Sequence, residues 1–159
     1  MKTKNISENF LAIEDEFSSY ENSKIVILPV PYEHTTSYGQ GTAKGPDAII
    51  EASHYVEFYD EEFRSQLCFD KGIATLYPVE FDGRHDKDAL DLIEQTVDKL
   101  LADGKLVVTL GGEHTISTAP IKSHFKKYPD MSILHFDAHS DLRENYEDNP
   151  YSHASFMHR

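Results

Sequence analysis

Three short apolar runs, each bounded by residues that break regular structure, are the clearest hydrophobic pattern in the chain. They are Lys24–Val30, Lys105–Leu110 and Met131–Phe136. Each is rich in aliphatic residues and shows little polar alternation, which is typical of a strand buried on both faces of a sheet. We therefore predict a strand at each run, with a further short strand near Gly72–Leu76.

Between these runs, apolar positions recur at the three- and four-residue spacing of a helix. The clearest helix is predicted over Asp86–Ala102, where Asp103-Gly104 supplies a stop signal. Two more helices are predicted, one beginning near Pro46 and one over Thr115–Tyr128. Strands that alternate with helices predict an α/β fold with a mainly parallel sheet.

Domain organisation follows from the same pattern. Residues 1–23 are polar and acidic and are predicted to form an N-terminal arm or a short helix, whereas residues 24–159 carry the α/β pattern. The remainder from Leu142 to Arg159 is polar and is expected to be a loop. In a parallel sheet, ligands bind beyond the carboxyl ends of the strands, so the segments that follow the predicted strands are the place to seek chemistry.

Charge and composition exclude several classes of partner. The chain has 159 residues, with 15 Lys and Arg against 28 Asp and Glu, and a formal net charge of −13. This balance argues against nucleic acid and anionic membrane surfaces as partners, because both need clustered positive charge. The single cysteine, Cys68, fits a reducing compartment, and no leader or membrane span is evident, so a cytoplasmic location is expected.

The strongest candidate chemistry is the alternation of Asp137, His139 and Asp141 directly after the third apolar run. Residues two apart in an extended segment point the same way, so these three could face one divalent metal ion. His114 follows Gly111-Gly112 at the end of another predicted strand and is a fourth candidate ligand. The alternatives are a solvated turn at 137–141 and a helix-start or core histidine at His114.

These residues resemble the ureohydrolases, the arginase and agmatinase family. The segment Phe136–Arg143 (FDAHSDLR) is similar to the family's metal-binding signature, and Gly111–Thr115 (GGEHT) to its first ligand motif. The loop Pro31–Tyr38 resembles the N-terminal loop of agmatinases, and Tyr151–Ala154 the segment that follows their metal motif. The resemblance implies an arginase-like fold, in which three α/β/α layers are built around the mainly parallel sheet.

The resemblance further implies a hydrolase with two Mn²⁺ ions. By analogy, His114, Asp137 and Asp141 bind one ion, His139 binds the other, and Asp137 bridges them. A hydroxide held by the metals would attack the guanidinium carbon of a small-molecule substrate, most simply agmatine, and yield urea and putrescine. His153 matches the family histidine that moves a proton to the leaving amine or places the substrate.

Other roles are weaker expectations. His34 and Tyr38 lie in the loop expected near the substrate and are candidate substrate contacts, and Glu113 is expected to orient a ligand. The remaining histidines, His135 in the third apolar run among them, are interpreted as structural. By resemblance, the intact protein is expected to form a homo-oligomer, a trimer or a hexamer.

The family's second metal motif, Ser-x-Asp-x-Asp, has no counterpart after Asp141, so the fold is expected to be incomplete at the C-terminus. One hypothesis is that the chain is the N-terminal part of a ureohydrolase and is inactive alone. Another is a non-catalytic metal-binding or interaction protein, and a third is an enzyme completed by a separate chain. An arginase or guanidinobutyrase activity is the alternative to agmatinase.

Overall fold

A three-stranded parallel sheet organises the computed structural model, which describes residues 1–159. Its strands are β1 (Ile25–Val30), β2 (Ile73–Thr75) and β3 (Leu106–Gly111), in the order β2-β1-β3. The register pairs Ile25 with both Ile73 and Leu106. The strands predicted at the first two apolar runs and near Gly72–Leu76 are thus confirmed.

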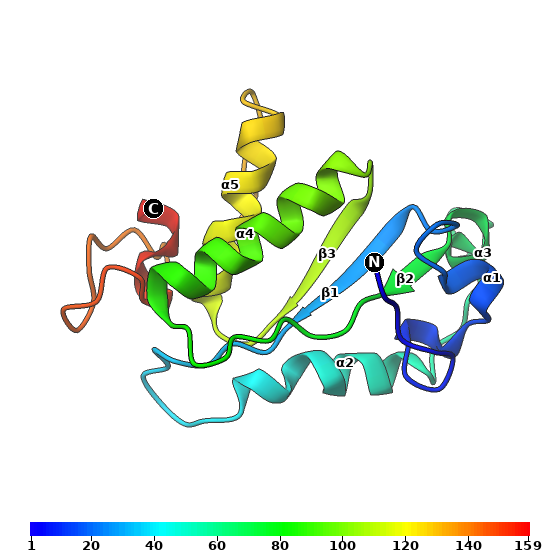
Figure 1. Cartoon of the computed structure of the whole chain (residues 1–159), viewed down its shortest axis with the longest axis horizontal. Coiled ribbons are helices and arrows are strands. Elements are labelled where there is room, and N and C mark those ends of the chain that lie inside the picture. Colours follow the sequence, from blue (N-terminus) through cyan, green and yellow to red (C-terminus); the bar gives the residue numbers. More distant parts are fainter.

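Helices cover both faces of this sheet (Figure 1). The α-helices are α1 (Asp15–Ser18), α2 (Gly45–Ser53), α3 (Leu67–Lys71), α4 (Asp86–Ala102) and α5 (Thr118–Lys127). Short 3-10 helices are η1 (Phe10–Ala12), η2 (Thr42–Lys44), η3 (His114–Ser117) and η4 (His153–His158). Helices α4 and α5 lie on one side of the sheet and α2 on the other, which gives the predicted three-layer α/β/α arrangement.

The core forms because β1 is buried on both faces. Val26, Leu28 and Val30 belong to the larger apolar cluster, which includes the inward stripe of α4. Ile27 lies in a second cluster with Ile13 of the N-terminal segment. This alternation is the period-two pattern of a strand between two layers, and it explains why the run has no polar positions.

The third apolar run, Met131–Phe136, does not form the predicted strand. Its backbone lies outside the ladder, since β3 pairs only with β1, and a cavity of about 580 Å³ separates part of it from β3. Leu134 is 80% exposed and Phe136 is 89% exposed. A run of apolar residues becomes a strand only when its N–H and C=O groups bond to a neighbouring strand, and this run makes no ladder with the open edge of β3.

The segment after Leu142 also differs from the expectation of a loop, because it contains η4. Phe156 is buried on this helix, and the backbone oxygen of Tyr151 accepts a hydrogen bond from the Thr115 hydroxyl at 2.9 Å. The segment therefore packs against η3, near the carboxyl ends of the strands (Figure 1).

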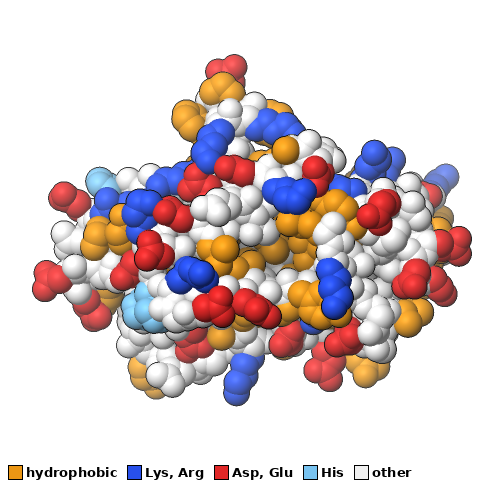
Figure 2. All heavy atoms as spheres, viewed as in Figure 1, with side chains coloured by type: hydrophobic (Ala, Val, Ile, Leu, Met, Phe, Trp, Pro, Cys, Tyr) orange, Lys and Arg blue, Asp and Glu red, His pale blue; other side chains and the backbone are white.

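The surface carries charges of both signs. Figure 2 shows acidic side chains spread over one face, with Lys and Arg side chains and exposed hydrophobic groups between them. None of the helices is long and apolar enough to cross a membrane.

Candidate metal centre

Two glycines allow the chain to turn closely past the end of β3. A Cβ atom on Gly112 would lie 2.0 Å from the backbone oxygen of Tyr32, and one on Gly111 would lie 2.2 Å from Cδ1 of Ile116. The backbone of Tyr32 cannot give way, so glycine is required at Gly112, whereas a side chain at Gly111 would have to displace the end of Ile116. The turn starts η3 at His114, which places this histidine at the carboxyl edge of the sheet.

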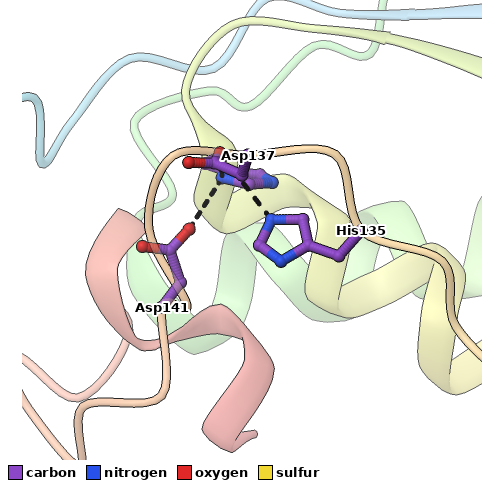
Figure 3. A group of neighbouring side chains, drawn as sticks. His135, Asp137 and Asp141 are labelled. Carbon is purple, nitrogen blue, oxygen red and sulfur yellow. Dashed lines mark ion pairs between the residues drawn. The ribbon is translucent and has the colours of Figure 1, made fainter.

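Four side chains converge at that edge. Nδ1 of His114 lies 3.0 Å from Oδ2 of Asp141 and 3.3 Å from Oδ2 of Asp137. Nε2 of His135 lies 3.7 Å from the same Asp137 oxygen. Figure 3 shows His135, Asp137 and Asp141 pointing toward one another from the segment that follows α5. The structure thus brings together three of the four ligands that the sequence predicted, and adds His135.

His139 lies outside this group. The backbone N–H of His139 donates to Oδ1 of Asp137 at 2.8 Å, and the chain bends over residues 137–139. An Asp side chain that accepts from the backbone two residues later closes a turn, and the turn ends the extended alternation on which the prediction relied. The His139 side chain is 83% exposed, with Nδ1 3.5 Å from Oδ1 of Asp137.

Sequence reasoning interpreted His135 as structural, but the structure leaves its Nε2 atom buried without a hydrogen-bond partner. A buried polar atom without a partner is costly, and a metal ion is one way to satisfy it. His135 precedes Asp137 by two residues. Extending the alternating pattern of Asp137, His139 and Asp141 by two residues toward the N-terminus would therefore have included it. Phe156 packs on both histidines, with ring centroids 3.9 Å from His114 and 5.2 Å from His135.

The donor set fits a divalent transition metal. One atom from each of His114, His135, Asp137 and Asp141 lies within 4.8 Å of all the others. Atoms bound to one ion at about 2.1 Å lie no more than about 4.2 Å apart, so a small contraction would close the shell. Imidazole and carboxylate donors suit Mn, Fe, Co or Zn, and thiolates are absent from the group.

The pKa shifts of His114 and Asp137 favour the unprotonated side chains that can bind a metal ion. Burial lowers the pKa of His114, while Asp141 and Asp137 oppose that shift. The pKa of Asp137 is lowered, chiefly because the His139 N–H donates to it. A neutral imidazole and an ionised carboxylate are the forms that bind metals. Asp141 has φ of 50°, a backbone conformation that non-glycine residues adopt mainly where surrounding structure enforces it.

His153 begins η4 and is held by two hydroxyls of the loop that follows β1. Its Nδ1 lies 3.3 Å from Oγ1 of Thr35, and its Nε2 lies 3.0 Å from Oγ of Ser37. Thr35 is in turn bound by the buried Glu113, which accepts hydrogen bonds from the Thr35 backbone N–H and hydroxyl and so holds this loop. His153, His139 and Asp141 line one cavity of about 400 Å³.

The two candidate substrate contacts lie in different settings. His34 stacks on His85 with ring centroids 4.0 Å apart, and it lines a separate cavity of about 490 Å³. Glu33 closes the loop beside it by accepting the backbone N–H groups of Gly41 and Ala43. Tyr38 lies at the far tip of this loop and is fully exposed, so it contacts neither cavity.

The sequence profile of the Arginase family matches residues 23–159. The chain belongs to the arginase family. It is 43% identical over 142 residues to the agmatinase of Halalkalibacterium halodurans, an alignment that covers 87% of this chain and 47% of that protein. It is 36% identical over 150 residues to the N(1)-aminopropylagmatine ureohydrolase of Synechocystis sp., covering 91% of this chain and 49% of that protein.

The fold agrees with this membership. The structure of the agmatine ureohydrolase of Thermoplasma volcanium superposes with a TM-score of 0.77 at 28% identity, covering 99% of this chain and 50% of that one. The chain spans about half the length of these relatives. The resemblance found in the sequence motifs and the arginase-like fold are therefore both confirmed.

Proposed function

We propose that the intact protein hydrolyses a guanidino compound, most simply agmatine, to putrescine and urea. The observation that carries the proposal is the convergence of His114, Asp137 and Asp141 at the carboxyl edge of the sheet. Membership of the arginase family and 43% identity to an agmatinase support the reaction class.

The proposed cofactor is a pair of Mn²⁺ ions. His114, Asp137 and Asp141 would hold one ion with His135 as a further donor, and His139 would hold the other, with Asp137 between them. Such ions lower the pKa of a bound water, so that a hydroxide is available near neutral pH. The exposed position of His139 leaves its imidazole accessible to an ion beside Asp137.

The chain's own groups would do the remaining work. The cavity beside the cluster brings His153 to the same space as Asp141 and His139, where a guanidinium group can lie between the nucleophile and a proton donor. His153 would give a proton to the leaving amine, a role suited to an imidazole because its ring nitrogens can both take up and release a proton. His34 and Tyr38 remain proposed substrate contacts because their loop resembles the N-terminal loop of agmatinases.

A second candidate substrate is N(1)-aminopropylagmatine. It is favoured by the 36% identity to the Synechocystis enzyme that carries its name, over a longer stretch than the agmatinase alignment covers. Both compounds carry the same guanidinium group and differ in the amine beyond it, so the cluster itself does not distinguish them. We place agmatine first because of the higher identity to agmatinase.

Assembly and location complete the proposal. We expect the intact enzyme to form a homo-oligomer, a trimer or a hexamer, which size-exclusion chromatography with light scattering would measure. We expect it to work in the cytoplasm, where a protein with one buried free cysteine stays reduced.

Urea release tests the proposed function. The intact protein, loaded with Mn²⁺, is given agmatine, N(1)-aminopropylagmatine, arginine or 4-guanidinobutyrate, and urea is measured. We expect agmatine to give the highest kcat/KM, and His153→Ala to lower kcat by at least about 100-fold. Preference for another of the four changes the substrate but keeps the reaction, whereas no urea from any of them overturns the proposal. The 159-residue chain alone, assayed in parallel, is expected to release none.

A further inference from the structure

A chain of hydrogen bonds links the buried carboxylate of Glu113 to the ring of His153 through the Thr35 hydroxyl. Oγ1 of Thr35 donates to Oε1 of Glu113 at 2.7 Å, and the same Oγ1 lies 3.3 Å from Nδ1 of His153. Glu113 is only 4% exposed. The three residues come from the loop after β1, the turn after β3 and the start of η4, so the link joins three separate segments.

Every contact that Glu113 makes in this link is with a donor. The backbone N–H groups of His34 and Thr35 donate to Oε2 at 2.8 and 2.6 Å. The Thr35 hydroxyl donates to Oε1. A carboxylate accepts hydrogen bonds and donates none, so the hydroxyl hydrogen of Thr35 is committed to Glu113.

That commitment determines the role of Oγ1 toward His153. A hydroxyl has one hydrogen and two lone pairs. The backbone N–H of His153 uses one lone pair at 3.1 Å, which leaves the other for the ring. Oγ1 can only accept from Nδ1, so Nδ1 is the ring nitrogen that carries the hydrogen.

We propose that Glu113 and Thr35 are positioning residues that hold neutral His153 with its hydrogen on Nδ1 and its lone pair on Nε2. Nε2 then faces only the Ser37 hydroxyl, at 3.0 Å, which can rotate to donate to it or leave it free. Nε2 is thus the atom that takes up a proton and passes it on. The use of this proton in catalysis rests on the proposed function, whereas the position of the hydrogen on the ring does not.

Glu113→Gln distinguishes this role from a purely structural one. The glutamine oxygen can still accept both backbone N–H groups, but its NH₂ group must donate to Oγ1 of Thr35. The Thr35 hydroxyl is then free to donate to Nδ1 of His153. The substitution reverses the direction of the chain of hydrogen bonds, and the ring hydrogen moves to Nε2.

Long-range ¹H–¹⁵N correlation spectra of the ¹⁵N-labelled 159-residue chain test this directly, because they distinguish the protonated ring nitrogen from the unprotonated one. The spectra are recorded at about pH 8.5, well above the ordinary histidine pKa of about 6.5. His153 is assigned from the signals that His153→Gln removes. We expect the wild-type chain to show hydrogen on Nδ1, and E113Q to show it on Nε2.

Three further variants serve as controls. Thr35→Val keeps the shape of the side chain and removes the hydroxyl, so the ring of His153 should become a mixture of its two tautomers. Thr35→Ser keeps the hydroxyl and should keep the wild-type spectrum. Ser37→Ala should also keep the wild-type spectrum. The Ser37 hydroxyl can rotate to suit either state of Nε2, so it does not determine which ring nitrogen carries the hydrogen. Hydrogen on Nε2 in the wild type, or an unchanged spectrum in a folded Thr35→Val chain, would overturn the proposal.

The outcome is separable from the proposed function. In the intact enzyme we expect Thr35→Val to lower kcat by at least about tenfold with little change in KM, and Thr35→Ser to restore most of it. If the spectra behave as expected but no variant or wild type releases urea, the positioning role holds and the proposed reaction fails. If urea is released and the tautomer does not respond, the reaction stands and the positioning role is wrong.

Discussion

Nδ1 of His114 lies 3.0 Å from Oδ2 of Asp141, although the two residues belong to segments on either side of α5. Helix α5 leads the chain away from the strand ends, and the segment that follows α5 brings it back (Figure 1). The Phe156 ring then packs against the His114 ring and ties η4 to η3. The cluster of candidate metal ligands is therefore a product of tertiary packing around η3 and η4, and not of one local motif.

Asp141→Asn should weaken the binding of Mn²⁺ to the chain by at least about tenfold, because the amide keeps the shape but loses the charge that a hard cation needs. Isothermal titration with Mn²⁺ measures this. Asp130→Asn, which removes an exposed carboxylate outside the cluster, is the matched control and should leave the affinity unchanged. Equal loss in both variants would mean that Mn²⁺ binds to diffuse surface charge.

His135→Ala and His139→Ala should affect different ions. His135 belongs to the cluster and has a buried, unpartnered Nε2, so its removal should weaken the first equivalent of Mn²⁺. His139 lies outside the cluster, so its removal should spare the first equivalent and weaken the second. Titration of both variants in the intact protein would separate the two steps. Loss of the first equivalent in His139→Ala alone would contradict this assignment.

The loop that carries His34 should loosen in acid. Backbone N–H groups of Ala43 and Gly41 lower the pKa of Glu33 below its ordinary value of about 4.3. A carboxyl group with a lowered pKa in the folded state stabilises that state above the ordinary value, and the stabilisation is lost as pH falls through the lowered one. The Tm of wild type should exceed that of Glu33→Gln at pH 7, and the difference should shrink below about pH 4. A difference that is independent of pH would contradict this origin.

Ile93→Ala should lower the free energy of unfolding by about 2–5 kcal/mol, because Ile93 is fully buried between α4 and the sheet and leaves a cavity. Chemical denaturation of both chains measures the change. Ile49→Ala removes the same atoms from a half-exposed position on α2 and should cost much less. Similar losses at the two sites would mean that the core is not packed as described.

The hydrophobic pattern of the sequence predicted helix α4 and strands β1 and β3. Helix α4 has the predicted bounds, since its apolar stripe and the Asp103-Gly104 stop act within the helix itself. Strand β1 is buried as its run predicts, whereas β3 forms by pairing with β1 although Leu106 and Val108 are exposed. Met131–Phe136 is also an apolar run, but the pattern alone does not determine whether a run pairs with a sheet edge, and this one makes no ladder with the open edge of β3.

The sequence predicted three of the four residues of the cluster. His114 follows the end of β3 as predicted, and Asp137 and Asp141 meet it there although the run before them is not a strand. The exchange of His139 for His135 was not predicted, because one hydrogen bond from the His139 N–H to Asp137 bends the chain. The link from Glu113 to His153 through Thr35 joins residues far apart in sequence, and no local pattern indicates it.

The position of the metal tests the central claim most directly. Crystals grown with Mn²⁺ can be measured on either side of the Mn absorption edge, so that anomalous scattering locates the ion without assumptions about its ligands. The account predicts a peak within bonding distance, about 2.0–2.3 Å, of His114, Asp137 and Asp141. A peak only elsewhere on the surface, or none at millimolar Mn²⁺, would contradict it.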